Sequence, residues 1–161
     1  MRDRLLSEYS NFFREKLNHC ELFTITVSFK CSYGSKGVTN ACLDTYDFNI
    51  LRKIRKQLWR NYKKNLDTIP YEYFRYHEYD EKSIFKRDSM NTPNHIHGIL
   101  PIDKKYMGNF WNYELKRVNT RIVKDIKSLR YVSSLLIEPM RSDELSNWIN
   151  YCLKKKNMEN I

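Results

Sequence analysis

The sequence lacks several features that assign a chain to a common protein class. No apolar run approaches membrane-spanning length, so we expect no transmembrane helix. The first residues contain no long apolar segment, and we therefore expect no secretory signal peptide. No Gly-x-x-x-x-Gly-Lys-Ser/Thr sequence is present, which argues against an attached NTPase module.

Cysteine is scarce, and its spacing gives no metal motif. The four cysteines are Cys20, Cys31, Cys42 and Cys152, and none forms a Cys-x-x-Cys pair. A zinc ribbon or a redox motif is therefore not supported. We expect free thiols in a reducing compartment, which fits a cytoplasmic location in a host cell.

Basic and aromatic residues are abundant instead. The formal net charge of +10 attracts polyanions, of which nucleic acid is the commonest, although charge alone fits a merely basic soluble protein equally well. Twelve tyrosines and eight phenylalanines add stacking partners for bases, which favours a single strand over a duplex. A hydrophobic content of 41% is enough to fill a core without disulfides or metal, and the length predicts one domain over residues 1–161.

Hydrophobic periodicity predicts alternating helices and strands. Spacing of three to four residues indicates helices over 1–18, 47–63, 111–129 and 142–156. Period-two alternation or aromatic and β-branched enrichment indicates strands over 21–29, 71–79, 95–102 and 131–137. Residues 31–46 and 80–92 read as loops, Asp44 or Thr45 is expected to cap the second helix, and Ser142 the last.

This order predicts an α+β fold. The middle of the chain reads β-α-β-β-α-β, the ferredoxin-like or split β-α-β arrangement, in which two helices cover one face of an antiparallel sheet. Extra helices precede and follow it at the N- and C-terminal ends.

Two histidines mark a candidate metal site. His95 and His97 flank Ile96, and because strand side chains alternate, both imidazoles lie on one face while Ile96 and Gly98 point into the core. Imidazoles at that spacing can hold one divalent ion.

The preceding strand is expected to supply a carboxylate ligand. Glu78 is the preferred residue, which would make a site for Mg²⁺ or Mn²⁺ with positions left open for phosphate. His77, Asp80 and Glu81 lie beside it, with His77 on the other face of the strand.

The last predicted helix contains a candidate nucleophile. Tyr151 is followed by Lys154 and Lys155, which share its helical face because they lie three and four residues on. A nearby ammonium group favours phenolate and can neutralise a phosphate. Read alone, this segment also fits an ordinary amphipathic helix with a basic tail.

Together these segments resemble the HUH endonucleases, specifically the single-tyrosine rolling-circle replication initiator (Rep) proteins. The first motif of that family is a strand like Phe23-Thr24-Ile25-Thr26, the second is His-hydrophobic-His, matched at His95 to His97, and the third is Tyr-x-x-Lys, matched at Tyr151 to Lys154. The resemblance covers roughly residues 21–156, and the order of the motifs also matches. The long stretch between Glu78 and His95 departs from the family, which leaves the acidic ligand open.

The resemblance implies a transesterification. Tyr151 would attack the scissile phosphate of a single-stranded origin or hairpin, leaving a 5′-phosphotyrosine and a free 3′-hydroxyl, with the ion as Lewis acid and template. Thr24, Thr26 and Lys155 are candidate DNA contacts. The process would start rolling-circle replication of a plasmid or virus, with host helicase and polymerase as partners and no membrane.

Two other functions fit parts of the sequence. A single-tyrosine transposase of the insertion-sequence type shares the histidines and the tyrosine, and swapped dimers would favour it. The lysine three residues after Tyr151 favours Rep. A non-catalytic ferredoxin-like RNA-binding module would use the aromatic residues of 71–79 for stacking, but it leaves the histidine pair unexplained.

Overall fold

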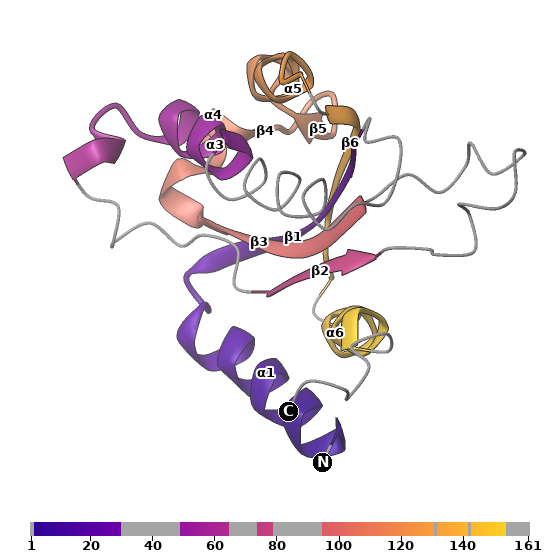
Figure 1. Cartoon of the computed structure of the whole chain (residues 1–161). Helices are drawn as coiled ribbons and strands as arrows, with labels where there is room; N and C mark the ends of the chain where they lie inside the picture. Colours follow the sequence, from indigo (N-terminus) through magenta and orange to yellow (C-terminus); the bar gives the residue numbers. More distant parts are fainter. Residues whose placement is uncertain are drawn as a thin grey trace, which may run out of the picture.

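The computed structural model describes residues 2–29, 49–64, 74–78, 95–130, 132–141 and 143–153 (Figure 1). Along the chain the elements are α1 (Arg2–Lys16), β1 (Cys20–Phe29), α3 (Leu51–Leu58), η2 (Tyr62–Lys64), β2 (Phe74–Glu78), β3 (His95–Asp103), η5 (Lys104–Tyr106), α4 (Met107–Phe110), β4 (Trp111–Asn112), β5 (Arg117–Val118), α5 (Thr120–Lys127), β6 (Val132–Pro139) and α6 (Leu145–Leu153).

A four-stranded antiparallel sheet organises the molecule. Its strand order is β2-β3-β1-β6, so β1 and β3 are central and each strand pairs with antiparallel neighbours. The connections from β1 to β2 and from β3 to β6 each cross over a neighbouring strand. The predicted α+β class is confirmed, and the strand order is compatible with the predicted split β-α-β arrangement.

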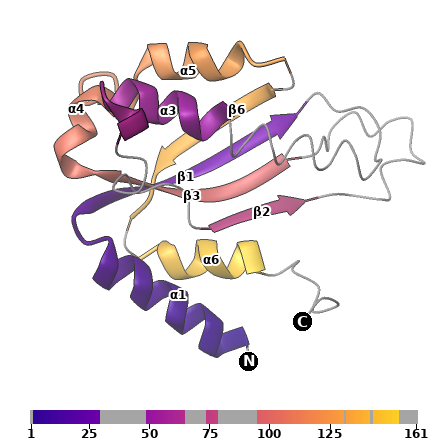
Figure 2. The same ribbon diagram turned by 60° about the vertical axis from the view of Figure 1, so that its left-hand side comes forward.

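Helices cover the sheet on both faces. In Figures 1 and 2, α3 and α5 lie on one side of the sheet, and α1 and α6 lie on the other. Each side has its own apolar cluster: the larger one contains residues of α3, α4 and α5, and the smaller one contains residues of α1 and α6.

The alternation in β1 explains this two-sided arrangement. Phe23, Ile25 and Val27 are buried in the larger cluster. On the opposite face, Cys20 is buried in the smaller cluster with α1 and α6, whereas Thr26 is only partly covered. One face of β1 is thus apolar throughout, and the other changes from apolar to hydroxyl-bearing along the strand.

The long helix predicted over 111–129 is wrong. Trp111–Asn112 pairs with Arg117–Val118 as a small hairpin, and only Thr120–Lys127 is helical. The side chain of Asn112 accepts a hydrogen bond from the backbone N–H of Leu115 at 2.8 Å, which satisfies a turn instead of a helix. Lys116 has φ 46°, outside the helical region.

Other predicted elements are present with different bounds. The helix predicted over 47–63 is regular only from Leu51 to Leu58, where Trp59 turns to an extended conformation, and η2 follows. The last helix begins at Leu145. The predicted loops 31–46 and 80–92 and the predicted caps Asp44, Thr45 and Ser142 lie outside the described residues. Among the helices described, none has the length and apolar character needed to cross a membrane.

Candidate active site

His97 occupies the centre of the sheet on the α1/α6 side. Its residue is 92% covered, and its Nδ1 lies 2.9 Å from Oγ1 of Thr26, the residue directly opposite on β1. An imidazole that donates from Nδ1 carries its lone pair on Nε2, which is the form that binds metals. The next residue toward the core, Ile96, is fully buried in the larger cluster, as predicted.

The register of β2 and β3 brings the predicted ligand positions together along the backbone. Glu78 pairs directly with His95, and Tyr76 pairs with His97. Directly opposite residues of an antiparallel pair share a face, so the positions of Glu78, His95 and His97 belong to the same face of the sheet. His77 pairs with Ile96 and belongs to the other face. The side chains of Glu78, His77 and His95 lie outside the described set.

The last helix places Tyr151 against His97. The two ring centroids are 5.3 Å apart at an interplanar angle of 80°, an edge-to-face contact. Trp148 contacts both rings: it stacks on Tyr151 at 5.6 Å and 21°, and it meets His97 edge-to-face at 5.5 Å. Tyr151 remains 48% exposed. A phenol from α6 and an imidazole from β3 thus adjoin on one face, with the phenol ring open to solvent.

Trp148 ties α6 to the sheet. Its Nε1 donates a hydrogen bond to the carbonyl oxygen of Gly98 at 3.2 Å, immediately after His97. Trp148 and Tyr151 are three residues apart and therefore share a side of the helix. The indole consequently fixes the height of Tyr151 above the strand as well as the side on which its ring lies.

The first helix of the chain supports α6 from behind. Leu145 and Ile149 of α6 are buried with Phe13 of α1 in the smaller cluster. The hydroxyl groups of Ser10 and Ser146 lie 3.2 Å apart between the two helices. The position of Tyr151 therefore depends on an apolar contact with a helix distant in the sequence.

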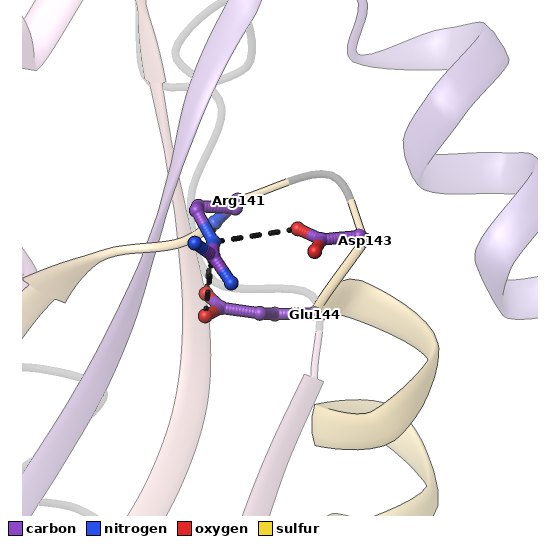
Figure 3. Close-up of polar contacts among 3 residues, drawn as sticks. All are labelled: Arg141, Asp143 and Glu144. Carbon is purple, nitrogen blue, oxygen red and sulfur yellow. Dashed lines mark hydrogen bonds and ion pairs between the residues drawn. The ribbon is translucent and has the colours of Figure 1, made fainter.

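An acidic turn precedes α6 (Figure 3). The backbone N–H of Arg141 donates to Oε2 of Glu144 at 3.1 Å, and the Arg141 guanidinium lies 3.2 Å from Oε1 of Glu144 and 3.5 Å from Asp143. Carboxylates at this end of a helix also interact favourably with its dipole. The contacts fix the direction in which the chain leaves β6 and enters α6.

The residues present fit a divalent cation. His97, with Nδ1 held by a hydroxyl, has the outer partner that metal-binding histidines commonly have. Two imidazoles and a carboxylate are a donor set for Mg²⁺ or Mn²⁺. Among the side chains that the structure describes, no three His, Cys, Asp or Glu residues form a group that could hold a metal ion. His95 and Glu78 are not among those side chains, so the predicted ligand set stays a prediction.

The remaining predicted residues have separate outcomes. Thr24 lies on the same face as Thr26, and its hydroxyl is 3.5 Å from the carbonyl oxygen of Glu138 on β6. Lys154 and Lys155 lie beyond the described part of α6. The roles of Thr24 and Thr26 in DNA binding stay predictions.

Sequence reasoning misses three features of this site. The helical pattern assigns Trp148 to the core side of its helix, but its indole also contacts Tyr151 and His97. Thr26 is expected only as a DNA contact, and its hydrogen bond to His97 follows from strand pairing that the sequence does not specify. The support from α1 has no local signal. For Trp148 a signal exists, since it lies three residues before Tyr151.

Comparison with known proteins gives no relative: no protein-family model, no curated protein sequence and no solved structure matches this chain. The functional argument therefore depends on the site itself.

Proposed function

We propose that this chain is a metal-dependent, single-tyrosine nicking enzyme of the HUH type. It would cut and rejoin single-stranded DNA through a 5′-phosphotyrosine on Tyr151 and so initiate rolling-circle-type replication of a plasmid or virus. The observation that carries the proposal is the contact of the Tyr151 and His97 rings at 5.3 Å. The resemblance requires this proximity between two motifs that are far apart in the sequence, and no local pattern imposes it.

The proposed reaction conserves the number of phosphodiester bonds. The phenolic oxygen of Tyr151 forms a bond to phosphorus while the bond from phosphorus to the 3′ oxygen breaks. The phenolic proton is lost as the ester forms, and the departing 3′ oxygen gains a proton. Since one ester replaces another, attack by a 3′-hydroxyl on the phosphotyrosine reverses the step and rejoins the strand.

Each residue has one task in this scheme. His95, His97 and Glu78 would hold Mg²⁺ or Mn²⁺, which when bound polarises the scissile phosphate. Thr26 holds the His97 imidazole through Nδ1. Trp148 holds the Tyr151 ring by stacking and by its bond to Gly98, which restricts the phenol before the substrate arrives. Lys154 is proposed to neutralise charge on the phosphate.

The position of α6 bears on the choice between Rep and transposase. This helix packs on the sheet of its own chain and on α1, so Tyr151 adjoins His97 without exchange of helices between two copies. An exchanged helix would favour a transposase. The intramolecular arrangement therefore supports a replication initiator.

A trapping experiment tests the proposal. The protein is incubated with a random single-stranded DNA pool and Mn²⁺, denatured, and examined for covalent adducts. We expect wild-type protein to form an adduct and Tyr151→Phe to form none, since the substitution removes the attacking oxygen and keeps the ring. Tyr113→Phe is the matched control: Tyr113 is 65% exposed in the turn of the β4–β5 hairpin, and this variant should form as much adduct as wild type.

Peptide mapping identifies the nucleophile. Trypsin cleavage after Arg141 and Lys154 releases Tyr151 on a peptide with no other tyrosine. Tyr76, which pairs with His97 in the sheet, falls on a separate peptide that begins after Arg75. A nucleotide on the Tyr76 peptide, or an adduct that persists in Tyr151→Phe, would reject Tyr151 as the nucleophile. Absence of any adduct with single-stranded DNA would reject the function.

A further inference from the structure

Positive charge is concentrated on the side of the sheet opposite Tyr151. The outward faces of α3 and α5, together with η2 and the residues beside it, carry exposed basic side chains. They are Arg52, Lys56, Arg60, Lys63, Lys64, Arg121, Lys124 and Lys127, here called the basic surface. The helices lie on the same side of the sheet in both views (Figures 1 and 2), and Gln57 of α3 donates a hydrogen bond to Asp125 of α5 at 2.8 Å.

Little negative charge offsets this surface. Within α3, η2 and α5, Asp125 is the only carboxylate, and it is partly buried and bonded to Gln57. On the other side of the sheet the described ion pairs neutralise basic residues locally. Arg4 pairs with Glu8 on α1, and Arg141 pairs with Asp143 and Glu144 before α6. The two sides of the molecule thus differ in their attraction for a polyanion.

The basic surface offers charge but few open ring faces. Trp59 packs against Tyr106 with ring centroids 5.6 Å apart, and the hydroxyl of Tyr62 accepts a hydrogen bond from Nε of Arg52 at 3.2 Å. That bond also lowers the pKa of Tyr62. Single strands are bound largely by stacking of their bases on exposed rings, whereas a duplex offers its phosphates and keeps its bases stacked inside. The surface therefore suits a duplex.

We infer that the basic surface binds the phosphate backbone of double-stranded DNA. The choice of DNA rests on the proposed function, while the binding itself requires neither metal nor Tyr151. A duplex held by α3 and α5 would leave the opposite side of the sheet, with the exposed Tyr151 ring, for an adjoining single strand. One domain would then hold both parts of a junction between double-stranded and single-stranded DNA, on its two faces.

Charge removal tests this inference. The variant Lys56→Gln, Arg121→Gln, Lys124→Gln removes three charges from the basic surface, and Arg52 is kept because it bonds Tyr62. The matched control Arg4→Gln, Arg14→Gln, Arg141→Gln removes three exposed charges from the other side. Affinity for a labelled duplex of about 20 base pairs is measured by fluorescence anisotropy in EDTA over a range of salt concentrations.

We expect the basic-surface variant to lose on the order of 10- to 100-fold in duplex affinity at about 0.1 M salt, with a shallower salt dependence, by about 0.9 per lost phosphate contact. The control should lose much less. Equal losses in the two variants, or an unchanged duplex affinity, would overturn the inference. An equal loss for a short single strand would also overturn it.

Two further measurements distinguish the duplex from an anionic membrane and the basic surface from the proposed catalytic site. The first uses vesicles containing phosphatidylserine: a loss of vesicle binding with unchanged duplex binding overturns the inference in favour of a membrane. The second is adduct formation on a short single strand, which should be the same in the basic-surface variant and in wild type, because none of the three residues belongs to the proposed catalytic site. If no protein forms an adduct yet duplex binding falls as expected, the proposed function fails and the basic surface stands.

Discussion

The two faces of the sheet are built from the same strands but are used differently. Toward α3 and α5, alternate residues of β1 are Phe23, Ile25 and Val27, all buried. Toward α1 and α6, the same strand presents Cys20 at the packed end and Thr26 beside His97. One face is occupied by apolar packing along its length, whereas the other combines packing with an imidazole and a phenol. Stability and chemistry are thus separated by the pleat of a single strand.

The largest expected effect is on the face that carries the chemistry. His97→Ala removes a proposed metal ligand and the ring against which Tyr151 packs, so nicking should fall to background. Single-strand binding should largely remain, because basic and aromatic residues elsewhere still contact the strand. Nicking and fluorescence anisotropy on the same substrate measure both.

The control for this substitution is His19→Ala, at an exposed position in the turn after α1. It removes the same ring from the same protein and should leave nicking unchanged. Normal nicking by His97→Ala in Mg²⁺ would show that this histidine is not part of the reaction.

The next largest effect is expected on the apolar face. Ile25 is fully buried in the larger cluster, so Ile25→Ala should reduce the free energy of unfolding by about 3 kcal/mol. Leu136→Ala is the comparison, because Leu136 is 53% exposed and lies on the opposite face beside Thr26; a change within about 0.5 kcal/mol is expected there. Urea unfolding measures both. Similar losses in the two variants would contradict the division between the faces.

A smaller effect is expected from Thr26, which adjoins Ile25 in the chain. Thr26→Val keeps the shape and removes the hydroxyl that holds Nδ1 of His97. Loss of such an outer partner should weaken metal binding by about 10- to 100-fold, seen as a higher Mn²⁺ concentration for half-maximal nicking. Thr26→Ser should restore most of the affinity because it returns the hydroxyl.

Thr24→Val is the matched control for Thr26. It removes a hydroxyl from the same face, two residues away, where the contact is with the Glu138 carbonyl and not with an imidazole. The Mn²⁺ requirement should be nearly unchanged. An equal shift in both threonine variants would assign the effect to the strand as a whole and reject a positioning role for Thr26.

Local patterns predict the parts of the molecule that local forces determine. Alternation in 21–29 predicts β1, and the spacing of His95 and His97 predicts that both belong to one face, on which the His97 ring indeed lies away from the larger cluster. The apolar spacing from Trp111 to Leu129 is misleading, because the side chain of Asn112 stabilises a turn and buried Val118 belongs to a hairpin strand. Periodicity records which side of an element is apolar, and it cannot choose between a helix and a short hairpin in such a segment.

Contacts between distant elements are beyond the reach of the sequence. Nothing in residues 2–16 indicates that Phe13 packs with Ile149 or that Ser10 adjoins Ser146. The Tyr151–His97 contact is expected only through a resemblance, and the bond from Trp148 to Gly98 is not expected at all. Such contacts depend on strand order and on the path of the chain between elements, which composition and spacing leave undetermined.

The contact between α1 and α6 has a consequence for the order of events during synthesis. A chain made from its N-terminus presents α1 first, and domains generally fold as units while they emerge. Because Leu145 and Ile149 complete the cluster around Phe13, α1 has no partner helix on this face until residues 145–153 have been made. Tyr151 belongs to that same last segment. A nascent chain would therefore present a basic, DNA-attracting surface before it contains the tyrosine that cuts, and the ribosome-bound form would be a binder before it becomes an enzyme.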